Sequence, residues 1–524
     1  MTRIVPKFAV VDLFAGPGGL AEGFSAVTSE DGAHPFHIAL SVEKDKVAHS
    51  TLLLRSFLRQ FNDAYPQEYY DFLQAGIPEP DWSVLYPDQW RKATEEAIHL
   101  ELGSEGASDV WGSRVDAIRR KYGSNTLLIG GPPCQAYSLM GRARNIGIKG
   151  YKAEDDPKHF LYEEYISILT KLRPAAFVME NVKGMLSSQI NKGSVFDRIL
   201  ADLRSAGGES NYQLIALAAK GEAQVEMLPR EVRPADFVVR GEDFGLPQSR
   251  HRVIVVGVRR DIYDRLPASF STHDMLKAWQ GVTKLEDVLD GMPKLRSGLS
   301  KGDDSASWAA ALEKATRAVY KAVAMYEREP RDEFRARVRQ CEDLAEQTSL
   351  LPRAASKPNG IGISCPDSLK RWLLDCRLKM LPNNSTRGHM STDLARYLFV
   401  SIYGEMTGFS PKASDFPESL APKHVNWGSG KFADRFRVQL RGQPSTTITC
   451  HISKDGHYYI HPDPEQCRSL TVREAARLQT FPDNYLFKGN RTEQYIQVGN
   501  AVPPFLAKQI GDAIFCLLSA AHKI

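Results

Sequence analysis

Short apolar runs separated by helical patterns organise the first half of the chain. Helical spacing of apolar residues separates the first four runs. This alternation predicts an α/β fold built on a doubly wound, mostly parallel sheet. In such a sheet, binding and chemistry gather at the C-terminal ends of the strands. The predicted strands lie at 8–13, 36–42, 126–129, 175–179 and 253–258.

A different pattern begins after the last of these strands. Apolar residues from Trp308 to Tyr326 keep helical spacing, Pro330 interrupts the pattern, and a second, charged helix is expected at 331–346. Turn-rich stretches at 353–366 and 409–430 punctuate the rest. We therefore expect three parts, which are a first domain at 1–260, an inserted and largely helical domain at 261–440, and a C-terminal segment at 441–524 that returns to the first domain.

Two smaller regions complete this outline. Residues 46–120 are expected to form crossover helices and an insertion, broken by Pro78, Pro80 and Pro87, with a third strand at His99–Leu102 leading to Gly103 and Ser104. The tail from Leu470 to Leu518 is again helical, with a turn expected at Gln497-Val498-Gly499-Asn500.

Composition restricts the class of protein. The 524 residues are 42% hydrophobic and 25% charged, and they contain no apolar stretch of membrane-spanning length. The first apolar run continues directly into a glycine-rich loop, so it is interpreted as a strand and not as a secretion signal. A cytoplasmic protein without membrane attachment is expected.

Charge and cysteine content add little. The net charge is only +4, and its whole excess lies within 261–440, which hints at an anionic partner there. The seven cysteines have no C-x-x-C or Cys/His metal spacing, so we expect neither disulfides nor a metal. Six of them are interpreted as buried small hydrophobic residues. Cys134 is the exception.

The first candidate motif runs from Asp12 to Ala21. Its glycines follow a strand, where they let the backbone approach a ligand and open a helix whose N-terminus favours polar groups. Glu43, at the end of the next strand, is placed to accept hydrogen bonds from ribose hydroxyls. The spacing Gly16-x-Gly18-x-x-Ala21 also fits a dinucleotide-binding loop, so a nicotinamide enzyme stays open at this point.

The second motif is Gly130-Gly131-Pro132-Pro133-Cys134-Gln135-Ala136-Tyr137-Ser138. Two glycines and two prolines make a poor setting for a core thiol, whereas a rigid turn after a strand exposes a cysteine where backbone amides can lower its pKa. The following residues, 141–150, include Arg142 and resemble a basic loop that could close over phosphates.

The third motif follows a predicted strand, and the fourth precedes one. Glu180 and Asn181 lie just past an apolar run, in register with Cys134 at the same predicted sheet edge. Gln248, Arg250 and Arg252 are placed on one face by strand alternation as the chain enters 253–258. Two arginines together require an anionic or carbonyl partner, or a carboxylate such as Glu180; an exposed salt-bridge ladder is the alternative.

Taken together and in this order, the motifs resemble the cytosine-C5 DNA methyltransferase family. The resemblance covers roughly 8–260 and 440–518. The matching segments are Asp12 to Gly19, Pro132 to Ser138, Glu180-Asn181-Val182, Gln248 to Arg252, Leu470 to Gln479, and Gln497 to Pro504.

The family implies a doubly wound catalytic domain of the S-adenosylmethionine-dependent type with an inserted target-recognition domain. By resemblance, Cys134, Glu180, Arg250 and Arg252 are catalytic. The positions implied for S-adenosylmethionine are Asp12, Phe14, Ala15, Gly16, Gly18, Gly19, Glu43, Pro132, Asn500 and Val502. Those implied for DNA are Gln135, Ser138, Arg142, Gln248 and Thr449. The acidic residue that often binds the cofactor adenine after the third strand has no counterpart at Gly103 and Ser104.

The resemblance implies methyl transfer to C5 of a flipped-out cytosine in double-stranded DNA, through a bond between Cys134 and C6. A tRNA cytosine-C5 methyltransferase, a nicotinamide oxidoreductase and a catalytically silent DNA-binding module are the alternatives. A monomer is expected, with a cognate restriction endonuclease or another defence protein as the partner to consider.

Overall fold

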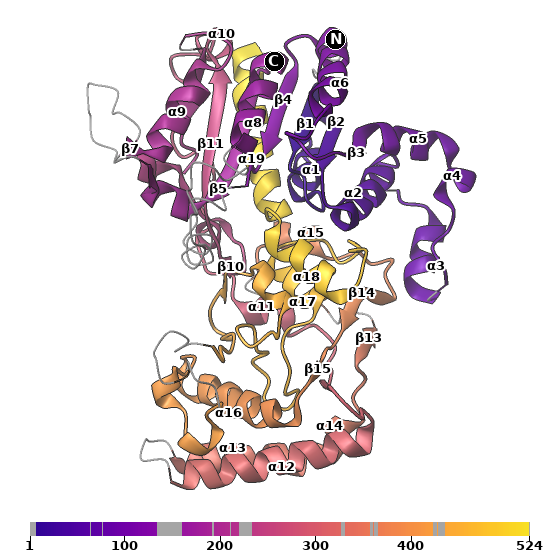
Figure 1. Cartoon of the computed structure of the whole chain (residues 1–524), viewed down its shortest axis with the longest axis vertical. Helices are drawn as coiled ribbons and strands as arrows, with labels where there is room; N and C mark the ends of the chain where they lie inside the picture. The colour runs from indigo at the N-terminus through magenta and orange to yellow at the C-terminus, as the bar shows by residue number, and fades with distance from the viewer. Residues whose placement is uncertain are drawn as a thin grey trace.

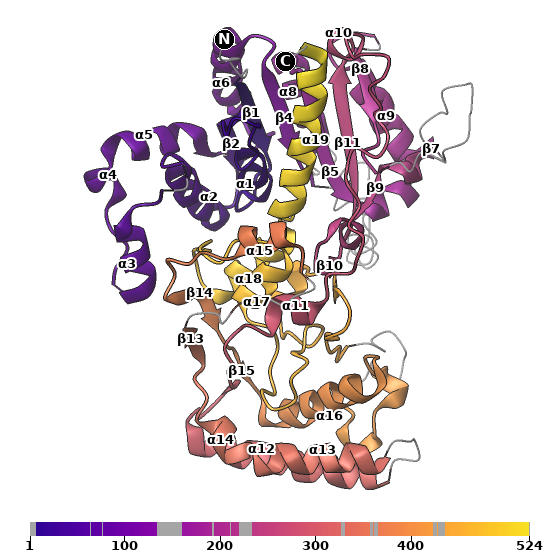
Figure 2. The same ribbon diagram turned by 180° about the vertical axis from the view of Figure 1, so that it is seen from behind.

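In the computed structural model, a sheet with helices on both sides stands above a smaller helical lobe (Figures 1 and 2). A middle layer built largely from the C-terminal part of the chain connects them. The structure describes residues 7–62, 64–75, 77–133, 160–190, 193–209, 211–218, 233–325, 331–356, 360, 365–422, 427 and 435–522.

The central sheet has the strand order β3-β2-β1-β4-β5-β11-β8, with β9 beside β11. Strands β1 to β5 run parallel, whereas β11 is antiparallel to β5, β8 and β9. The mostly parallel sheet predicted from the sequence is therefore confirmed. The strands are β1 (Phe8–Leu13), β2 (Phe36–Glu43), β3 (Ala97–His99), β4 (Thr126–Gly130), β5 (Ala176–Val182), β8 (Tyr212–Ile215), β9 (Val238–Arg240) and β11 (His251–Arg259).

Helices bury both faces of this sheet, as its apolar strands require. Helices α1 (Gly19–Ser25) and α19 (Pro504–His522) pack together on one face, while α6 (Ala107–Tyr122), α8 (Phe160–Leu172) and α9 (Val195–Ser205) cover the other. The stretch Arg491–His522 is long and apolar enough to cross a membrane by composition alone. However, 72% of its most apolar window is buried within the protein, so it serves as a core helix.

The insertion after β2 shows one confirmed and one wrong prediction. The prolines do separate helices, because α3 (Gln67–Ala75) ends before Pro78, α4 (Trp82–Leu85) follows Pro80, and α5 (Pro87–Glu96) begins at Pro87. The third strand, expected at His99–Leu102, instead occupies Ala97–His99, directly after α5. Its end therefore lies three residues earlier than expected. The other crossover helix, α2, spans Lys46–Arg59.

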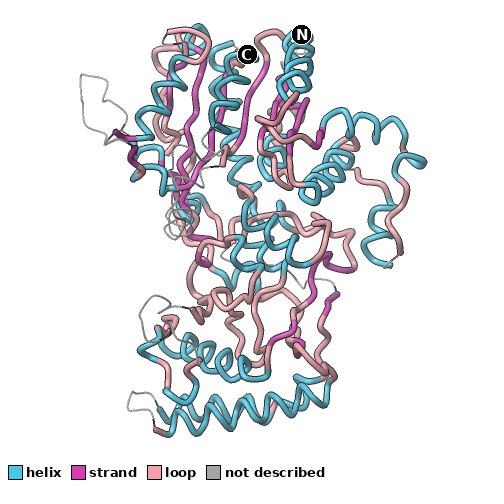
Figure 3. Tube along the Cα trace, in the orientation of Figure 1, coloured by secondary structure: helices cyan, strands magenta, loops and turns pink. Residues whose placement is uncertain are grey.

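The lower lobe is largely helical. Its main helices are α12 (Ser305–Ala324), α13 (Arg331–Asp343) and α16 (Ser391–Thr407) (Figure 3). They bury Trp308, Val338 and Phe399 in a core separate from the sheet. Short helices and two-residue strands connect this lobe to the middle layer. They are α11 (Leu285–Leu289), α14 (Ala345–Ser349), α15 (Asp367–Leu373), β12 (Gly298–Leu299) and β15 (Gly388–His389). The boundaries at 261 and 440 remain predictions.

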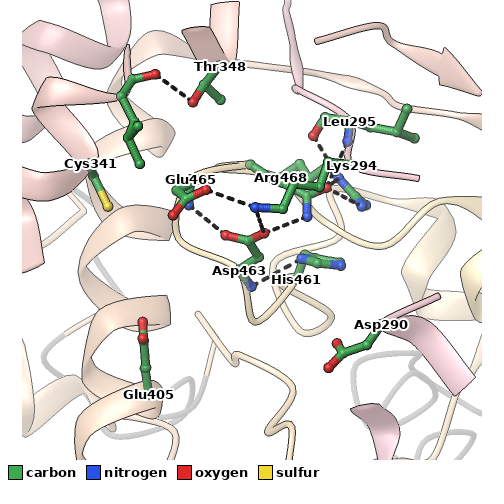
Figure 4. Close-up of polar contacts among 12 residues, drawn as sticks. Asp290, Lys294, Leu295, Cys341, Thr348, Glu405, His461, Asp463, Glu465 and Arg468 are labelled. Carbon is green, nitrogen blue, oxygen red and sulfur yellow. Dashed lines mark hydrogen bonds and ion pairs between the residues drawn. The ribbon is translucent and has the colours of Figure 1, made fainter. Parts of the chain in front are cut away.

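The tail after residue 440 joins this lobe to the sheet. Arg468 is buried and forms an ion pair with Glu474 at 2.6 Å, while its Nε donates to the carbonyl of Leu295. Lys294 pairs with Glu465 at 3.1 Å (Figure 4). Charged groups of the tail are thus bonded to the start of the predicted insertion. The tail helices are α17 (Val472–Leu478), α18 (Arg491–Asn500) and α19; the turn expected at Gln497–Asn500 is instead the last part of α18.

The expectation of six buried cysteines is wrong. Cys341, Cys365 and Cys467 are buried, but Cys450 is partly exposed, and Cys376 and Cys516 are exposed.

Candidate active site

The glycine-rich loop after β1 takes a conformation that most residues avoid. Gly16 and Gly18 have φ values of +58° and +100°, and Phe14 also adopts a left-handed conformation, with φ of +56°. Such a conformation costs a non-glycine residue about 1–3 kcal/mol and is typical of functional sites. Ala15 is bonded through its N–H to the carbonyl of Val42, which fastens the loop to β2. The loop is therefore held between two strand ends.

Glu43 is joined directly to this loop. Its Oε2 accepts from the N–H of Gly16 at 2.7 Å and its Oε1 accepts from the N–H of Asp45 at 2.7 Å. Burial raises the pKa of Glu43, and the hydrogen bonds from Asp45 and Gly16 oppose that rise. Among the described residues, a Cβ placed on Gly16 would meet open space. The loop and Glu43 therefore enclose room for a ligand with polar groups.

The C-terminal segment closes the loop from the other side. The hydroxyl of Tyr485 donates a short hydrogen bond to the carbonyl of Pro17. A Cβ on Gly19 would lie 2.3 Å from the backbone oxygen of Val502, so only glycine fits there. Asn500 is exposed at the end of α18, and Val502 is nearly buried. Val502 thus acts through its backbone, as a support for the loop.

Asp12 does not reach the loop surface. Its side chain is fully buried within β1, and this burial raises its pKa well above the ordinary value, with Arg59 acting in the opposite direction. The direct cofactor contact expected of Asp12 therefore remains a prediction, made for a carboxyl that is fully buried in the structure. Phe14, by contrast, is partly exposed.

The turn leading to Cys134 fits between two strand ends. A Cβ on Gly130 would lie 2.6 Å from the carbonyl oxygen of Leu13, and one on Gly131 would lie 2.9 Å from Oε2 of Glu180. Asn181 donates from Nδ2 to the carbonyl of Pro132 at 3.1 Å. The two glycines thus allow close approach to β1 and to Glu180. The predicted site residues Cys134, Gln135, Ser138 and Arg142 lie outside the described residues.

Glu180 and Arg252 form the central polar pair of the site. Arg252 Nε lies 2.9 Å from Glu180 Oε1, and both side chains are 13% exposed. Arg252 also donates to the carbonyl of His251 at 2.8 Å. Burial lowers the pKa of Arg252, and the Glu180 carboxylate opposes this effect. The pair is sheltered from water yet reachable, next to the turn that precedes Cys134.

Arg250 and Gln248 are bonded to the tail, but Arg250 stays within the electrostatic reach of the central pair. Burial lowers the pKa of Arg250, Arg252 lowers it further, and Glu180 opposes this effect. Arg250 is buried and donates to the carbonyls of Ile448 and Ala501, each at 2.8 Å. The buried amide of Gln248 bonds to the carbonyl of Leu478 and to other interior groups. The strand is interrupted at Arg250, between β10 (Gln248–Ser249) and β11, so alternation does not continue through it. Both residues join the tail to the sheet, and their roles toward a substrate remain predictions.

Thr449 lies beside this junction. It is partly exposed, and its hydroxyl is 2.9 Å from the hydroxyl of Tyr459. A Cβ on Gly499 would lie 2.3 Å from the carbonyl carbon of Thr449, so the turn packs directly on α18. Thr449 is therefore held close to the residues that Arg250 bonds.

Sequence reasoning missed two residues of this region. Tyr485 gives no local signal, because its contact with Pro17 joins positions far apart in the chain. Glu101 was missed because the third strand was placed too late; with β3 ending at His99, Glu101 is the acidic residue that follows it. Glu101 pairs with Lys44, the neighbour of Glu43, at 3.1 Å.

Comparisons with known proteins agree with this arrangement. Residues 112–516 match the model of the C-5 cytosine-specific DNA methylase family. The type II methyltransferase M.Bpa9945I of Bacillus paralicheniformis is 32% identical, with 98% of this chain and 100% of that protein covered. DNA (cytosine-5)-methyltransferase 1 of Rattus norvegicus is 25% identical over 99% of this chain, which spans 29% of that protein.

A solved structure supports the fold alone. It is described as a DNA modification methyltransferase encoded within a prophage of E. coli, and it has a TM-score of 0.53 and 16% identity over 98% of this chain and 100% of its own. The family match and the full-length relative decide the assignment. The chain belongs to the C-5 cytosine-specific DNA methylase family and is a DNA (cytosine-5-)-methyltransferase.

Proposed function

We propose that this enzyme transfers a methyl group from S-adenosylmethionine to C5 of a flipped-out cytosine in a specific DNA sequence, with Cys134 as nucleophile. The observation that carries the proposal is the sheltered Glu180–Arg252 pair, which lies against Gly131 at the start of the turn to Cys134. A base placed there would meet a carboxyl group, a guanidinium and a cysteine-bearing turn together.

The loop residues fit the expected cofactor. Open space at Gly16, the partly exposed Phe14 and the buried acceptor Glu43 suit an adenine nucleoside with ribose hydroxyls. When bound, S-adenosylmethionine supplies an electrophilic methyl group. Ala15, Gly18, Gly19, Pro132, Asn500 and Val502 would form or support the walls, and Glu101 is placed to accept from the adenine amine.

Each residue of the polar centre has a proposed task. The Cys134 thiolate would add to C6 while the protonated Glu180 carboxyl donates its proton to N3, so that the ring can accept the electron pair. The electron pair at C5 would then form the bond to the methyl carbon, while the bond from that carbon to the sulfonium breaks and leaves a neutral thioether. Loss of the C5 proton, return of the N3 proton and departure of Cys134 restore the aromatic base. Arg252 holds the O2 oxygen, and Arg250 positions the site by binding carbonyls of the tail.

Recognition of DNA is assigned to several parts of the chain. Since C6 is inaccessible within a base stack, the target must be flipped out. Gln135, Ser138 and Arg142 would contact the DNA near Cys134, and Thr449 would contact the backbone of the flipped nucleotide. Residues 261–440 would read the flanking sequence, and exchanging them for those of a relative with another target should transfer specificity. A restriction endonuclease as partner and a monomeric state belong to the same proposal.

Duplex DNA containing 5-fluorocytosine tests the covalent step. Fluorine at C5 blocks the final proton removal, so a complex with Cys134 should survive denaturation once the methyl group is transferred. Incubation with S-adenosylmethionine should give this complex with the wild type and not with Cys134→Ser. Glu180→Gln should form it far more slowly, because an amide cannot supply the N3 proton.

Cys450→Ser is the matched control, since Cys450 is a partly exposed cysteine near Thr449. It should trap DNA as the wild type does. A complex that persists in Cys134→Ser would show that the nucleophile is assigned wrongly. Trapping of RNA in place of DNA would contradict the proposed substrate.

A further inference from the structure

One half of strand β2 has an uncovered edge. β1 pairs along the strand from Phe36 to Val42, whereas β3 on the other side pairs only with Ser41, Val42 and Glu43. Among the described residues, no strand lies on the outer side of Phe36–Leu40. An edge of this kind presents backbone N–H and C=O groups that can pair with another strand. Figure 1 shows β2 near this side of the sheet, with α5 and α6 beside it.

A groove of about 1120 Å³ includes this edge. Phe36, His37, Ile38 and Ala39 all line it, although neighbouring side chains of a strand point to opposite faces. Four consecutive lining residues therefore mean that the groove follows the backbone edge itself. Residues of α5 line the groove together with residues of α6. At about 3.3 Å per residue, the free edge has room for about four paired residues of an added strand.

The groove carries an excess of positive charge. Its four carboxylates are all ion-paired, because Glu22, Glu95, Glu96 and Asp375 pair with Arg55, Arg91, Arg59 and Arg377, respectively. By contrast, Lys92 of α5 and Arg114 and Lys121 of α6 are exposed, and no ion pair joins them to any described residue. These cations flank the free edge on both sides.

The charged groups around the groove also affect the pKa of His37, which lies on the free edge. Burial lowers the pKa of His37, and Lys7 and Lys121 lower it further, while Glu96 acts in the opposite direction. His37 therefore stays neutral near neutral pH and adds no charge to the groove. The lysines and arginine of the walls supply the charge selectivity.

We propose that the outer edge of Phe36–Leu40 binds an extended acidic segment of a partner protein by strand addition. Main-chain hydrogen bonds would supply affinity, and acidic side chains would meet Lys92, Arg114 and Lys121. The free edge is at the opposite end of β2 from Glu43, so docking there leaves the proposed cofactor loop accessible. A peptide is favoured over nucleic acid because the groove includes a strand edge with which no described strand pairs, and the hydrogen-bonding groups of such an edge match a peptide main chain and not a phosphate chain.

A fluorescent pool of extended peptides of about ten residues, acidic at alternate positions and varied elsewhere, tests the proposal. We expect the full-length protein to bind the pool in fluorescence anisotropy, and to show slower amide hydrogen exchange within residues 36–40 when the pool is bound. Lys92→Glu with Lys121→Glu should weaken binding by about tenfold or more, because attraction becomes repulsion. Methylation of DNA should be unchanged in this variant.

Two controls separate strand addition from charge alone. Lys277→Glu with Lys301→Glu, which changes exposed lysines outside the groove, should bind the pool like the wild type. The same pool with N-methylated backbone at alternate residues should bind at least about tenfold more weakly, since it lacks the pairing N–H groups. Absence of binding, or equal binding of the N-methylated pool, would overturn the proposal. Short DNA could displace the pool from the wild type but not from the Lys92→Glu, Lys121→Glu variant. That result would assign the groove to nucleic acid instead.

Discussion

Arg252 and Glu180 project from two adjacent antiparallel strands and form an ion pair of 2.9 Å at the edge of the sheet. The pair lies beside Gly131, where a Cβ would come within 2.9 Å of the Glu180 carboxylate. Neither side chain is more than 13% exposed. The guanidinium and carboxylate are therefore held in place before a cytosine arrives.

Arg252→Lys tests the need for a planar guanidinium at this position. Lysine keeps the charge but has no second donor in a fixed fork, so it cannot hold both Glu180 and a base oxygen. We expect kcat for DNA methylation to fall on the order of a hundredfold, with DNA affinity almost unchanged. Arg259→Lys, at the far end of β11 where Arg259 pairs with Asp261, is the control and should keep normal kcat. Equal losses in both variants would contradict a local role.

The cofactor pocket predicts a loss of affinity for S-adenosylmethionine. Phe14→Ala removes a ring that can stack on adenine, and Glu43→Ala removes the acceptor that is bonded to Gly16. Each should weaken binding by roughly 1–3 kcal/mol in calorimetric titration. Glu30→Ala, at an exposed position, should bind normally. Unchanged affinity in both pocket variants would remove the assignment.

Tyr485→Phe tests the support that the tail gives to the cofactor loop. The change leaves the Pro17 carbonyl without the Tyr485 hydroxyl, which should weaken S-adenosylmethionine binding roughly fivefold, or about 1 kcal/mol. Tyr69→Phe is matched to it, because Tyr69 is equally buried and donates to the carbonyl of Asn484 without touching the loop. Both variants should lose similar stability. A rise in KM for the cofactor in both would show that the effect is general destabilisation.

The buried carboxyl of Asp12 predicts a pH-dependent difference in stability. Its pKa is raised well above 3.8 in the folded protein, so above that pH the unfolded chain releases a proton that the folded protein keeps. This contribution to stability is complete below about pH 4 and declines as pH rises toward the folded pKa. Asp12→Asn lacks this titration, so it should gain stability relative to the wild type between about pH 4 and pH 7 in urea unfolding.

Asp31→Asn provides a control of opposite sign. The hydroxyl of Ser29 lowers the pKa of Asp31, so its contribution is present above 3.8 and is lost as pH falls. Its difference from the wild type should therefore shift in the other direction. A difference between Asp12→Asn and the wild type that is independent of pH would show that Asp12 is ionised in the folded protein.

The sequence by itself determined five strands of the central sheet and the turns that follow several of them. Apolar runs gave β1, β2, β4, β5 and β11 close to their observed positions, because strand periodicity and glycine or proline breaks are local properties. The same locality explains why the glycine loop, the turn before Cys134 and the carboxyl at Glu180 could be proposed as one site. All of them follow strand ends that a parallel sheet brings to one edge.

Only the tertiary structure decided which side chains meet. Arg250 and Arg252 have the same chemistry and an alternating spacing, yet one binds tail carbonyls and the other binds Glu180, because the strand is interrupted at Arg250. Tyr485 and Pro17 are separated by 468 positions, and the short β3 leaves half of β2 uncovered. Such partners depend on how distant segments pack, and a local pattern of polar and apolar residues does not specify that packing.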